Sequence, residues 1–211
     1  MTLRIDLGAL WLAHRRLIGP LRMEVPAGVV HTVMGPSGCG KSSLLAALCG
    51  TLAPPLRFDG SVWLDGQPVH QLPTALRRIG LLLQDDLLFA HLSVHENLLF
   101  AVPPGPRAQR MARVDHALHT LELQHLADAD PATLSGGQRS RVALMRAMLA
   151  EPRALLLDEP FSRLDAALRS RVRAHVFASI RDRGIPALLV THDEADIADP
   201  AHLTRLEERP E

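Results

Sequence analysis

The sequence predicts an α/β fold, and three patterns carry the prediction. A β-rich apolar run at residues 28–35, "GVVHTVMG", passes through a glycine-rich loop into residues 41–50, "KSSLLAALCG", whose leucines have helical spacing. Three short apolar runs each stop at a polar residue, as strands buried on both faces of a parallel sheet do, at residues 79–84, 154–159 and 185–193. The segment between the first and second of these runs changes to helical periodicity. We therefore expect an α/β core with a helical insertion.

Composition limits the possible functions. Hydrophobic residues make up 47% and charged residues 22% of the 211 positions, which is typical of a folded globule. The 23 basic and 23 acidic side chains cancel, so nucleic acid is not an expected partner. The apolar runs are far shorter than the roughly 18 residues of a membrane span, and Arg4 and Asp6 interrupt the start where a signal peptide would be apolar. Cys39 and Cys49 are too few for a disulfide framework. We expect a cytoplasmic protein.

The remaining elements follow in chain order. "SVWLDGQPV" at residues 61–69 alternates around an Asp-Gly pair, which predicts an antiparallel hairpin and hence an antiparallel β subdomain. "SVHENLL" has the form of a capping box, with Ser93 as the cap and Glu96 three residues later, so a helix begins there. The chain is expected to divide into three parts. Residues 1–84 form the first part of the core with the β subdomain, residues 85–150 form a helical subdomain, and residues 151–211 form the rest of the core.

The loop between the first strand and helix has the composition of a phosphate-binding loop. "GPSGCGKS" fits the pattern G-x-x-x-x-G-K-[ST] without a mismatch, and its place between strand and helix makes a mere glycine-rich turn the weaker alternative. Its backbone N–H groups can surround phosphate oxygens, while Lys41 reaches the β- and γ-phosphates and Ser42 binds Mg²⁺. The predicted nucleotide contacts are Gly35, Pro36, Ser37, Gly38, Cys39, Gly40, Lys41, Ser42 and Ser43.

Polar residues at the ends of the other strands predict a catalytic edge. Asp158 and Glu159 end the run "ALLL", and we expect Asp158 to hold Mg²⁺ and Glu159 to act as general base toward water. Gln84 and His192 end two further strands, so they should lie at the same edge of the sheet. We expect Gln84 to contact Mg²⁺ or the water, and His192 to contact the γ-phosphate. Each of these alone could be an ordinary solvated strand end; the phosphate loop favours the catalytic interpretation.

Five motifs in order, "GPSGCGKS", "LLLQ", "LSGGQ", "LLLDEP" and "VTHD", resemble those of the ATP-binding cassette ATPases over nearly the whole chain. The resemblance implies a P-loop NTPase fold, with a RecA-like mixed-sheet core, an antiparallel β subdomain and an inserted α-helical subdomain. It also implies an enzyme that binds ATP and Mg²⁺ and hydrolyses ATP. "LFAHLSVHENLLF" and "FSRLDAALR" further resemble the bacterial importer ATPases of the molybdate, sulfate, spermidine and maltose group.

The resemblance also implies partners. Such ATPases act as homodimers in the ATP-bound state, in which "LSGGQ" of one subunit, here Ser135, Gly136, Gly137 and Gln138, closes over ATP held by the other. Asp165 would lie in the loop that links the two sites. The region after Gln84 would dock a coupling helix of a permease, so two integral membrane permease subunits and, indirectly, a periplasmic or extracellular solute-binding protein are implied. The chain would then lie on the inner face of the cell membrane.

Two departures from the family pattern stand out. The family usually has an aromatic residue that stacks on adenine about 23 residues before the first loop glycine, a position occupied here by Leu12; Trp11 is one position away and is our hypothesis for this role. The chain ends nineteen residues after His192, so no C-terminal regulatory domain is expected.

The alternatives to an importer ATPase are an exporter ATPase, a non-transport cassette protein of DNA repair or translation, and a P-loop kinase or non-hydrolysing nucleotide-binding module. Arg77 and the pair Arg15 and Arg16 are interpreted as solvated.

Overall fold

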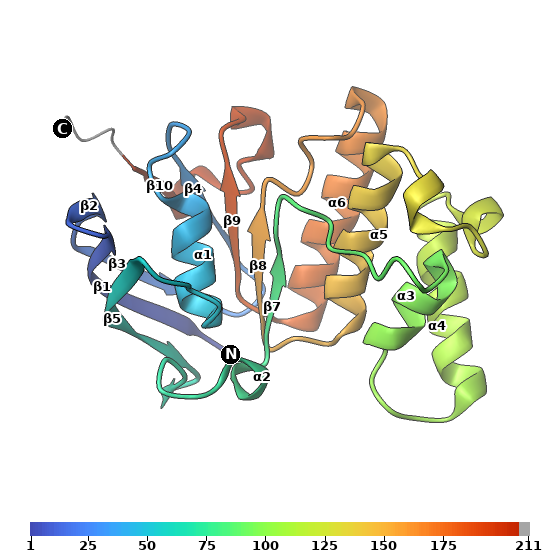
Figure 1. Ribbon diagram of the computed structural model, residues 1–211, viewed down its shortest axis with the longest axis horizontal. Helices are drawn as coiled ribbons and strands as arrows, with labels where there is room; N and C mark the ends of the chain where they lie inside the picture. Colours follow the sequence, from blue (N-terminus) through green and yellow to red (C-terminus); the bar gives the residue numbers. More distant parts are fainter. Residues whose placement is uncertain (207–211) are drawn as a thin grey trace.

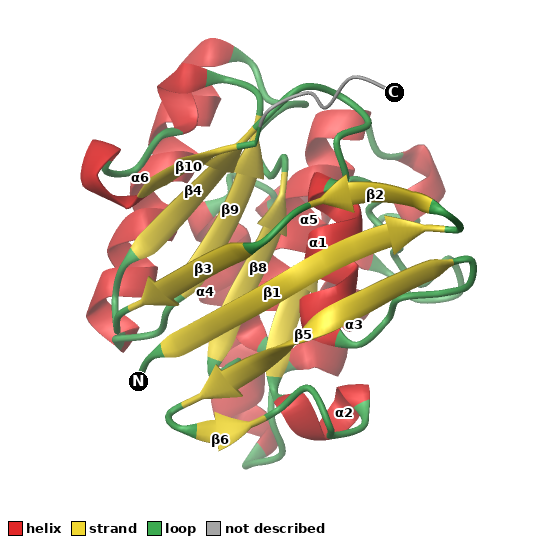
Figure 2. Ribbon diagram, turned by 90° about the vertical axis from the view of Figure 1, so that its left-hand side faces the viewer, coloured by secondary structure: helices red, strands yellow, loops and turns green. Residues whose placement is uncertain are grey.

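The computed structural model describes residues 1–206, in which two five-stranded sheets face each other across one helix (Figures 1 and 2). The first sheet is antiparallel and consists of β1 (Leu3–Leu12), β2 (Arg15–Ile18), β3 (Leu21–Val25), β5 (Leu56–Leu64) and β6 (Gln67–Pro68). The second is parallel, in the order β10-β4-β9-β8-β7, with bounds β4 (Val30–Met34), β7 (Ile79–Leu82), β8 (Ala154–Asp158), β9 (Ala187–Thr191) and β10 (Leu203–Arg205). The antiparallel and parallel strands thus form separate sheets.

The helices separate into three groups in Figure 1. Between the two sheets lies α1 (Lys41–Cys49), and the short α2 (Thr74–Arg77) precedes β7. On the far face of the parallel sheet lie α5 (Gly136–Leu149) and α6 (Ala166–Arg183). Farthest from the sheets lie α3 (Val94–Ala101) and α4 (Arg107–Thr120). Short 3-10 turns span Gln124–Leu126, Pro131–Thr133, Glu194–Asp196 and Pro200–His202. Within the described residues, no helix is long and apolar enough to cross a membrane.

The apolar side chains of the parallel strands pack into two hydrophobic cores. In β8, Leu156 packs into the core around α1 and the antiparallel sheet, whereas Leu155 and Leu157 pack into the core around α5, α6 and the helical insertion. Successive side chains of a strand point to opposite faces, so a strand covered on both faces must be apolar at every position. This explains the uninterrupted apolar runs. The polar residues at or just after the ends of β7, β8 and β9 lie together at one edge of the sheet.

The elements that local sequence signals predict, a hairpin and a capped helix, are present in the structure. The hairpin between β5 and β6 turns at Asp65 and Gly66, whose φ angles of 52° and 75° are the left-handed pair that an Asp-Gly hairpin turn requires. The capping box of α3 is present: Ser93 Oγ accepts from the Glu96 backbone N–H at 3.2 Å, and Glu96 Oε2 accepts from the Ser93 N–H at 2.8 Å.

The interpretation of Arg77 as a solvated residue is wrong. Its half-buried guanidinium donates hydrogen bonds of 2.9–3.2 Å to four backbone carbonyl oxygens, two of them in the last turn of α1. A helix leaves its last carbonyl groups without partners inside the helix, and a cation there satisfies them. Desolvation lowers the pKa of Arg77.

Candidate functional site

A cleft of about 630 Å³ opens at the carboxyl edge of the parallel sheet. It collects the residues that follow four different strands or begin α1, because parallel strands present their carboxyl ends at one edge. The lining residues predicted from the sequence are Ser37, Gly38, Gly40, Lys41, Ser42, Ser43, Gln84, Asp158, Glu159 and His192. Gly35, Pro36 and Cys39 belong to the same loop between β4 and α1. Residues separated by up to 180 positions in the chain, Leu12 and His192, thus share one site.

The phosphate loop presents an anion site at the start of α1. Gly38 and Gly40 have φ angles of 80° and 100°, which an L side chain rarely adopts. Gly40 is the N-cap of α1 and offers no side-chain hydrogen bond, so the first backbone N–H groups of the helix face the cleft without a capping side chain. Lys41 is only 7% exposed, and its Nζ donates to the carbonyl oxygens of Gly35 and Pro36, both at 2.7 Å. The loop therefore combines backbone donors with a buried cation, as a phosphate requires.

Asp158 ends β8 and is 3% exposed. Burial raises the pKa of its carboxyl group, while the Ser42 hydroxyl and the Lys41 ammonium act in the opposite direction. A buried carboxyl beside a hydroxyl, with the Gln84 amide on the same cleft wall, offers the hard oxygen ligands that Mg²⁺ prefers. Among residues 1–206 no group of three or more His, Cys, Asp or Glu gathers around one point. The donors that Ser42, Asp158 and Gln84 offer are of the kind that suits Mg²⁺.

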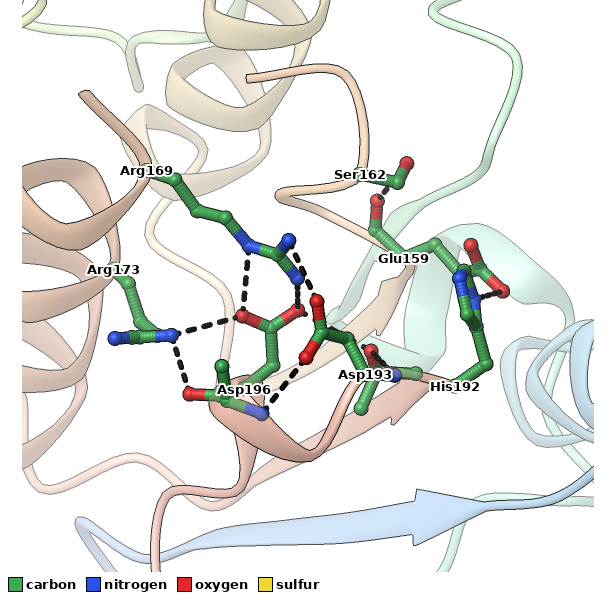
Figure 3. A network of polar contacts seen from close by, with 9 residues as sticks. Glu159, Ser162, Arg169, Arg173, His192, Asp193 and Asp196 are labelled. Atoms are coloured by element: carbon green, nitrogen blue, oxygen red, sulfur yellow. Dashed lines mark hydrogen bonds and ion pairs between the residues drawn. The ribbon is translucent and has the colours of Figure 1, made fainter. Parts of the chain in front are cut away.

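Glu159 and His192 lie side by side in the cleft lining and contact each other, with His192 Nδ1 2.8 Å from Glu159 Oε1 (Figure 3). Glu159 has a φ of 47°, a left-handed conformation that costs a non-glycine residue about 1–3 kcal/mol. Its N–H donates to the Val190 carbonyl at 2.9 Å, and its own carbonyl accepts from Ser162 Oγ at 3.0 Å. These bonds to the backbone hold the strained conformation. The Glu159 side chain is 17% exposed and can accept a proton from a water molecule in the cleft.

The residues of "LSGGQ" do not line this cleft. They lie at the start of α5, on the opposite side of the parallel sheet from α1 (Figure 1). Ser135 and Gln138 form a reciprocal capping box, with hydrogen bonds of 3.2 Å and 2.7 Å, so Ser135 is the N-cap of α5. Asp165 likewise caps α6, with its Oδ1 accepting from the Leu168 N–H at 3.0 Å.

The two glycines of "LSGGQ" differ in their surroundings. A Cβ atom at Gly137 would lie 2.8 Å from the backbone carbonyl oxygen of Arg163, so the packing of the chain itself requires glycine there. A Cβ at Gly136 would meet nothing closer than Arg163 Cδ at 4.0 Å. The described part of the chain therefore gives a packing reason for the second glycine and none for the first.

Trp11 does not line the cleft, so the structure gives its proposed adenine contact no support. The pairing of β1 with β2 shifts register between Leu10 and Trp11, and the neighbouring Leu12, 40% exposed, lines the cleft instead. Sequence reasoning also missed Arg15, Leu17 and Leu56, which complete this wall; none belongs to a motif. Counting back from Gly35 indicates Leu12, and this count was the one signal in the sequence that pointed to this residue of the cleft wall.

Comparisons with known proteins agree with this geometry. A family model described as "ABC transporter" matches residues 18–162. The chain is 50% identical over 190 residues to the "Uncharacterized ABC transporter ATP-binding protein YnjD" of Escherichia coli (strain K12), covering 90% of this chain and 88% of that protein. It is 39% identical over 189 residues to the sulfate/thiosulfate import ATP-binding protein CysA of Nephroselmis olivacea, covering 89% of this chain and 54% of the relative, so it spans about half of that longer protein.

Among solved structures, the fold resembles a dimeric post-hydrolysis state of the ATP-binding cassette MJ0796 bound to ADP and Pi. The TM-score is 0.79 at 26% identity, and the match covers 93% of this chain and 90% of the other. The expected fold, with its phosphate-loop core, is therefore confirmed.

Proposed function

This chain belongs to the ABC transporter family, and we propose that it is the ATP-binding and ATP-hydrolysing subunit of an importer. The observation that carries the proposal is the convergence of Lys41, Asp158, Glu159 and His192 on one cleft at the carboxyl edge of the sheet. Release of phosphate from ATP by the purified protein, with and without Mg²⁺, tests it. Absence of Mg²⁺-dependent release across a wide range of protein concentrations would contradict it.

Each cleft residue has a role that its surroundings favour. The backbone N–H groups at the start of α1 and the ammonium of Lys41 bind the phosphates. Ser42, Asp158 and Gln84 would hold Mg²⁺, which neutralises charge on the phosphate oxygens when bound. Glu159 accepts a proton from the attacking water, and His192, held beside it, orients toward the γ-phosphate. The apolar side chains of Leu12, Leu17 and Leu56 supply the wall on which the adenine ring would rest.

The complete site requires a second copy of the chain. No residue of "LSGGQ" lines the cleft of its own chain, although α5 offers a helix N-terminus suited to phosphate. The open surroundings of Gly136 indicate that something outside the monomer comes close to its backbone. We infer that Ser135, Gly136 and Gln138 of one copy cover the nucleotide bound to the other, with Asp165 near the junction. The dimeric structural neighbour supports this arrangement.

Paired substitutions at the two glycines test the dimer. Gly136→Asp is expected to leave the free energy of unfolding of the monomer within about 1 kcal/mol, because an acidic residue in the first turn suits the helix dipole. It should leave ATP binding intact and abolish turnover, since the carboxylate would face the partner's phosphates. Gly137→Ala should instead lower the free energy of unfolding by about 1–3 kcal/mol through overpacking against Arg163. Thermal melting, calorimetric ATP titration and ATPase assays separate the two effects.

Mixed dimers give the sharper version of this test. A dimer of one Gly136→Asp copy and one unmodified copy should lose the site whose phosphate loop belongs to the unmodified chain. Normal turnover of the Gly136→Asp protein at all concentrations would contradict the shared site.

An apolar groove beside the cleft fits the proposed permease. It has a volume of about 300 Å³ and lies among β7, the segment after Gln84, α3 and α5. Leu87 and Phe100 are 64% and 68% exposed, which is unusual for large apolar side chains outside an interface. The fully buried Asn97 holds the wall through hydrogen bonds to the backbone of Phe89, Leu92 and Ser93. These hydrogen bonds make the groove preformed, and it is continuous with the segment that leads to Gln84.

Substitution of a groove residue should separate docking from catalysis. Phe100→Asp is expected to keep the basal ATPase rate and to lose co-purification with the permease encoded in the same gene cluster, because a charge would be buried in the contact. Leu76→Asp, on an equally exposed leucine of α2 outside the groove, is the control. Retained co-purification of the Phe100→Asp protein would argue against the groove as the docking site.

Import rather than export is favoured by the relative named as an import ATP-binding protein and by the "HLSVHEN" stretch. The chain would then act on the cytoplasmic face of the membrane with two permease subunits and a solute-binding protein. A solute-binding protein gene beside the permease gene would support import, and its absence would favour the exporter alternative.

A further inference from the structure

His192 lies between two residues that one buried ionic network holds in place (Figure 3). The network centres on Asp196, which is 2% exposed. Asp196 accepts hydrogen bonds from Arg169 at 3.1 Å and 2.5 Å, and from Arg173 at 3.1 Å. It also accepts from the hydroxyl of Thr191, the residue before His192, at 3.2 Å.

The residue after His192 belongs to the same network. Asp193 Oδ2 lies 2.8 Å from Arg169 Nη1, so one guanidinium contacts both carboxylates. The Asp193 N–H donates to Thr191 Oγ1 at 3.1 Å, and Asp193 Oδ1 accepts from the Ala195 N–H at 2.8 Å. Arg173 also donates to the Ala195 carbonyl. Both backbone neighbours of His192 are thereby tied to α6.

The imidazole of His192 makes few contacts of its own that would fix its direction. Its side chain is 61% exposed, and within the described residues its hydrogen-bonding partner is Glu159. An exposed ring that must reach one phosphate position depends on its backbone for direction. An arginine that forks onto two carboxylates fixes that backbone more rigidly than a single hydrogen bond does.

We propose that Arg169 and Asp196 are positioning residues for His192, and that they fix the loop after β9 on α6 so that the imidazole points at the γ-phosphate. The proposal rests on the catalytic role proposed for His192. Arg169 lies one helical turn after Asp165, and its N–H donates to the Asp165 carbonyl at 2.8 Å. The network therefore also attaches His192 to the helix that begins where the partner copy approaches.

A double-mutant cycle tests the proposal. Asp196→Asn is expected to lower kcat by about 10- to 100-fold, as a misplacement near 1 Å does, while the Kd for ATP changes less than about twofold. In a His192→Ala background the same substitution should change kcat no further, because the group that it misplaces is gone. A residue that only stabilises the fold would lower kcat in both backgrounds. Equal losses in the two backgrounds, or an unchanged kcat in folded Asp196→Asn protein, overturn the proposal.

Further variants keep the test informative if Asp196→Asn folds poorly. Thr191→Val removes two hydrogen bonds of the network, the one to Asp196 and the one from the Asp193 N–H, while it leaves the contacts of both arginines with Asp196 in place. It should lower kcat in the same direction by a smaller factor. Glu194→Gln breaks the exposed pair with Arg205, 3.1 Å apart, in the same loop and should leave kcat unchanged. A kcat loss in Glu194→Gln equal to that of Thr191→Val would mean that any disturbance of the loop suffices, which overturns the specific role of the network.

The NMR signal of the His192 imidazole separates this proposal from the catalytic role itself. Its chemical shift should change in Asp196→Asn without nucleotide, and an unchanged signal contradicts positioning. Normal turnover in His192→Ala would instead remove the catalytic role of His192, whatever the network does.

Discussion

Glu159→Gln is expected to lower the rate of ATP hydrolysis by about 10²- to 10⁴-fold, the usual contribution of a general base. Glutamine has the size of glutamate and can keep the contact with His192, which is 2.8 Å away, but its amide cannot take a proton from water. MgATP should therefore still bind with near-normal affinity. In the proposed dimer, where each copy covers the ATP of the other, unhydrolysed ATP keeps the two copies together. An ATP-bound dimer should therefore accumulate, and size-exclusion chromatography with ATP measures it.

A glutamate-to-glutamine substitution outside the cleft, at Glu151, provides the control for Glu159→Gln. Glu151 is an exposed residue that pairs with Arg113 at 2.7 Å, so Glu151→Gln should leave hydrolysis unchanged. Near-normal hydrolysis by the Glu159→Gln protein would show that another group accepts the proton.

Lys41→Ala is expected to weaken ATP binding by about 10- to 100-fold, because a hydrogen bond to a charged group contributes about 1.5–3 kcal/mol. The ammonium of Lys41 already lies in the loop, held 2.7 Å from two carbonyl oxygens, so it needs little reorganisation to reach phosphate. Calorimetric titration with ATP measures the loss.

Lys41→Met separates charge from packing in this experiment, since it keeps most of the aliphatic stem. Both substitutions should weaken ATP binding to a similar degree if the charge is what matters. Unchanged affinity in both would contradict the role of the loop in phosphate binding.

The parts of the fold that could be predicted are those set by local pattern. The strands β7, β8 and β9 were evident because they are covered on both faces and are apolar up to their last residue, and β4 was evident as a β-rich run before the glycine-rich loop. The helix start at Ser93 follows from a capping box, which involves residues only three positions apart. The phosphate loop was equally local, since all its donors lie within one turn between strand and helix.

The parts that escaped prediction depend on how distant elements meet. Leu12 and Leu56 are paired across β1 and β5 and both line the cleft, and β1 is irregular between Leu10 and Trp11, so that Leu12 and not Trp11 faces the cleft. The buried role of Arg77 required the C-terminus of α1 to lie against it. Arg169 and Asp196 are 27 positions apart, and nothing in their sequence surroundings indicates that α6 meets the turn after β9.

The difference between Gly136 and Gly137 shows why a motif alone is not enough. In the sequence the two glycines are equivalent, and both were expected to allow a close approach to phosphate. Only the position of the Arg163 carbonyl oxygen separates a glycine required by folding from one that the chain leaves open.

Lys41 is also the only lysine among the 23 lysine and arginine residues of the chain. Acylation of ε-amines, which removes the positive charge, therefore has a single side-chain target, and that target is the phosphate loop. Because the amine is 7% exposed and donates to two carbonyl oxygens, it is shielded from reagents that react readily with surface amines. Reaction at an ε-amine thus reports on the opening of this one loop.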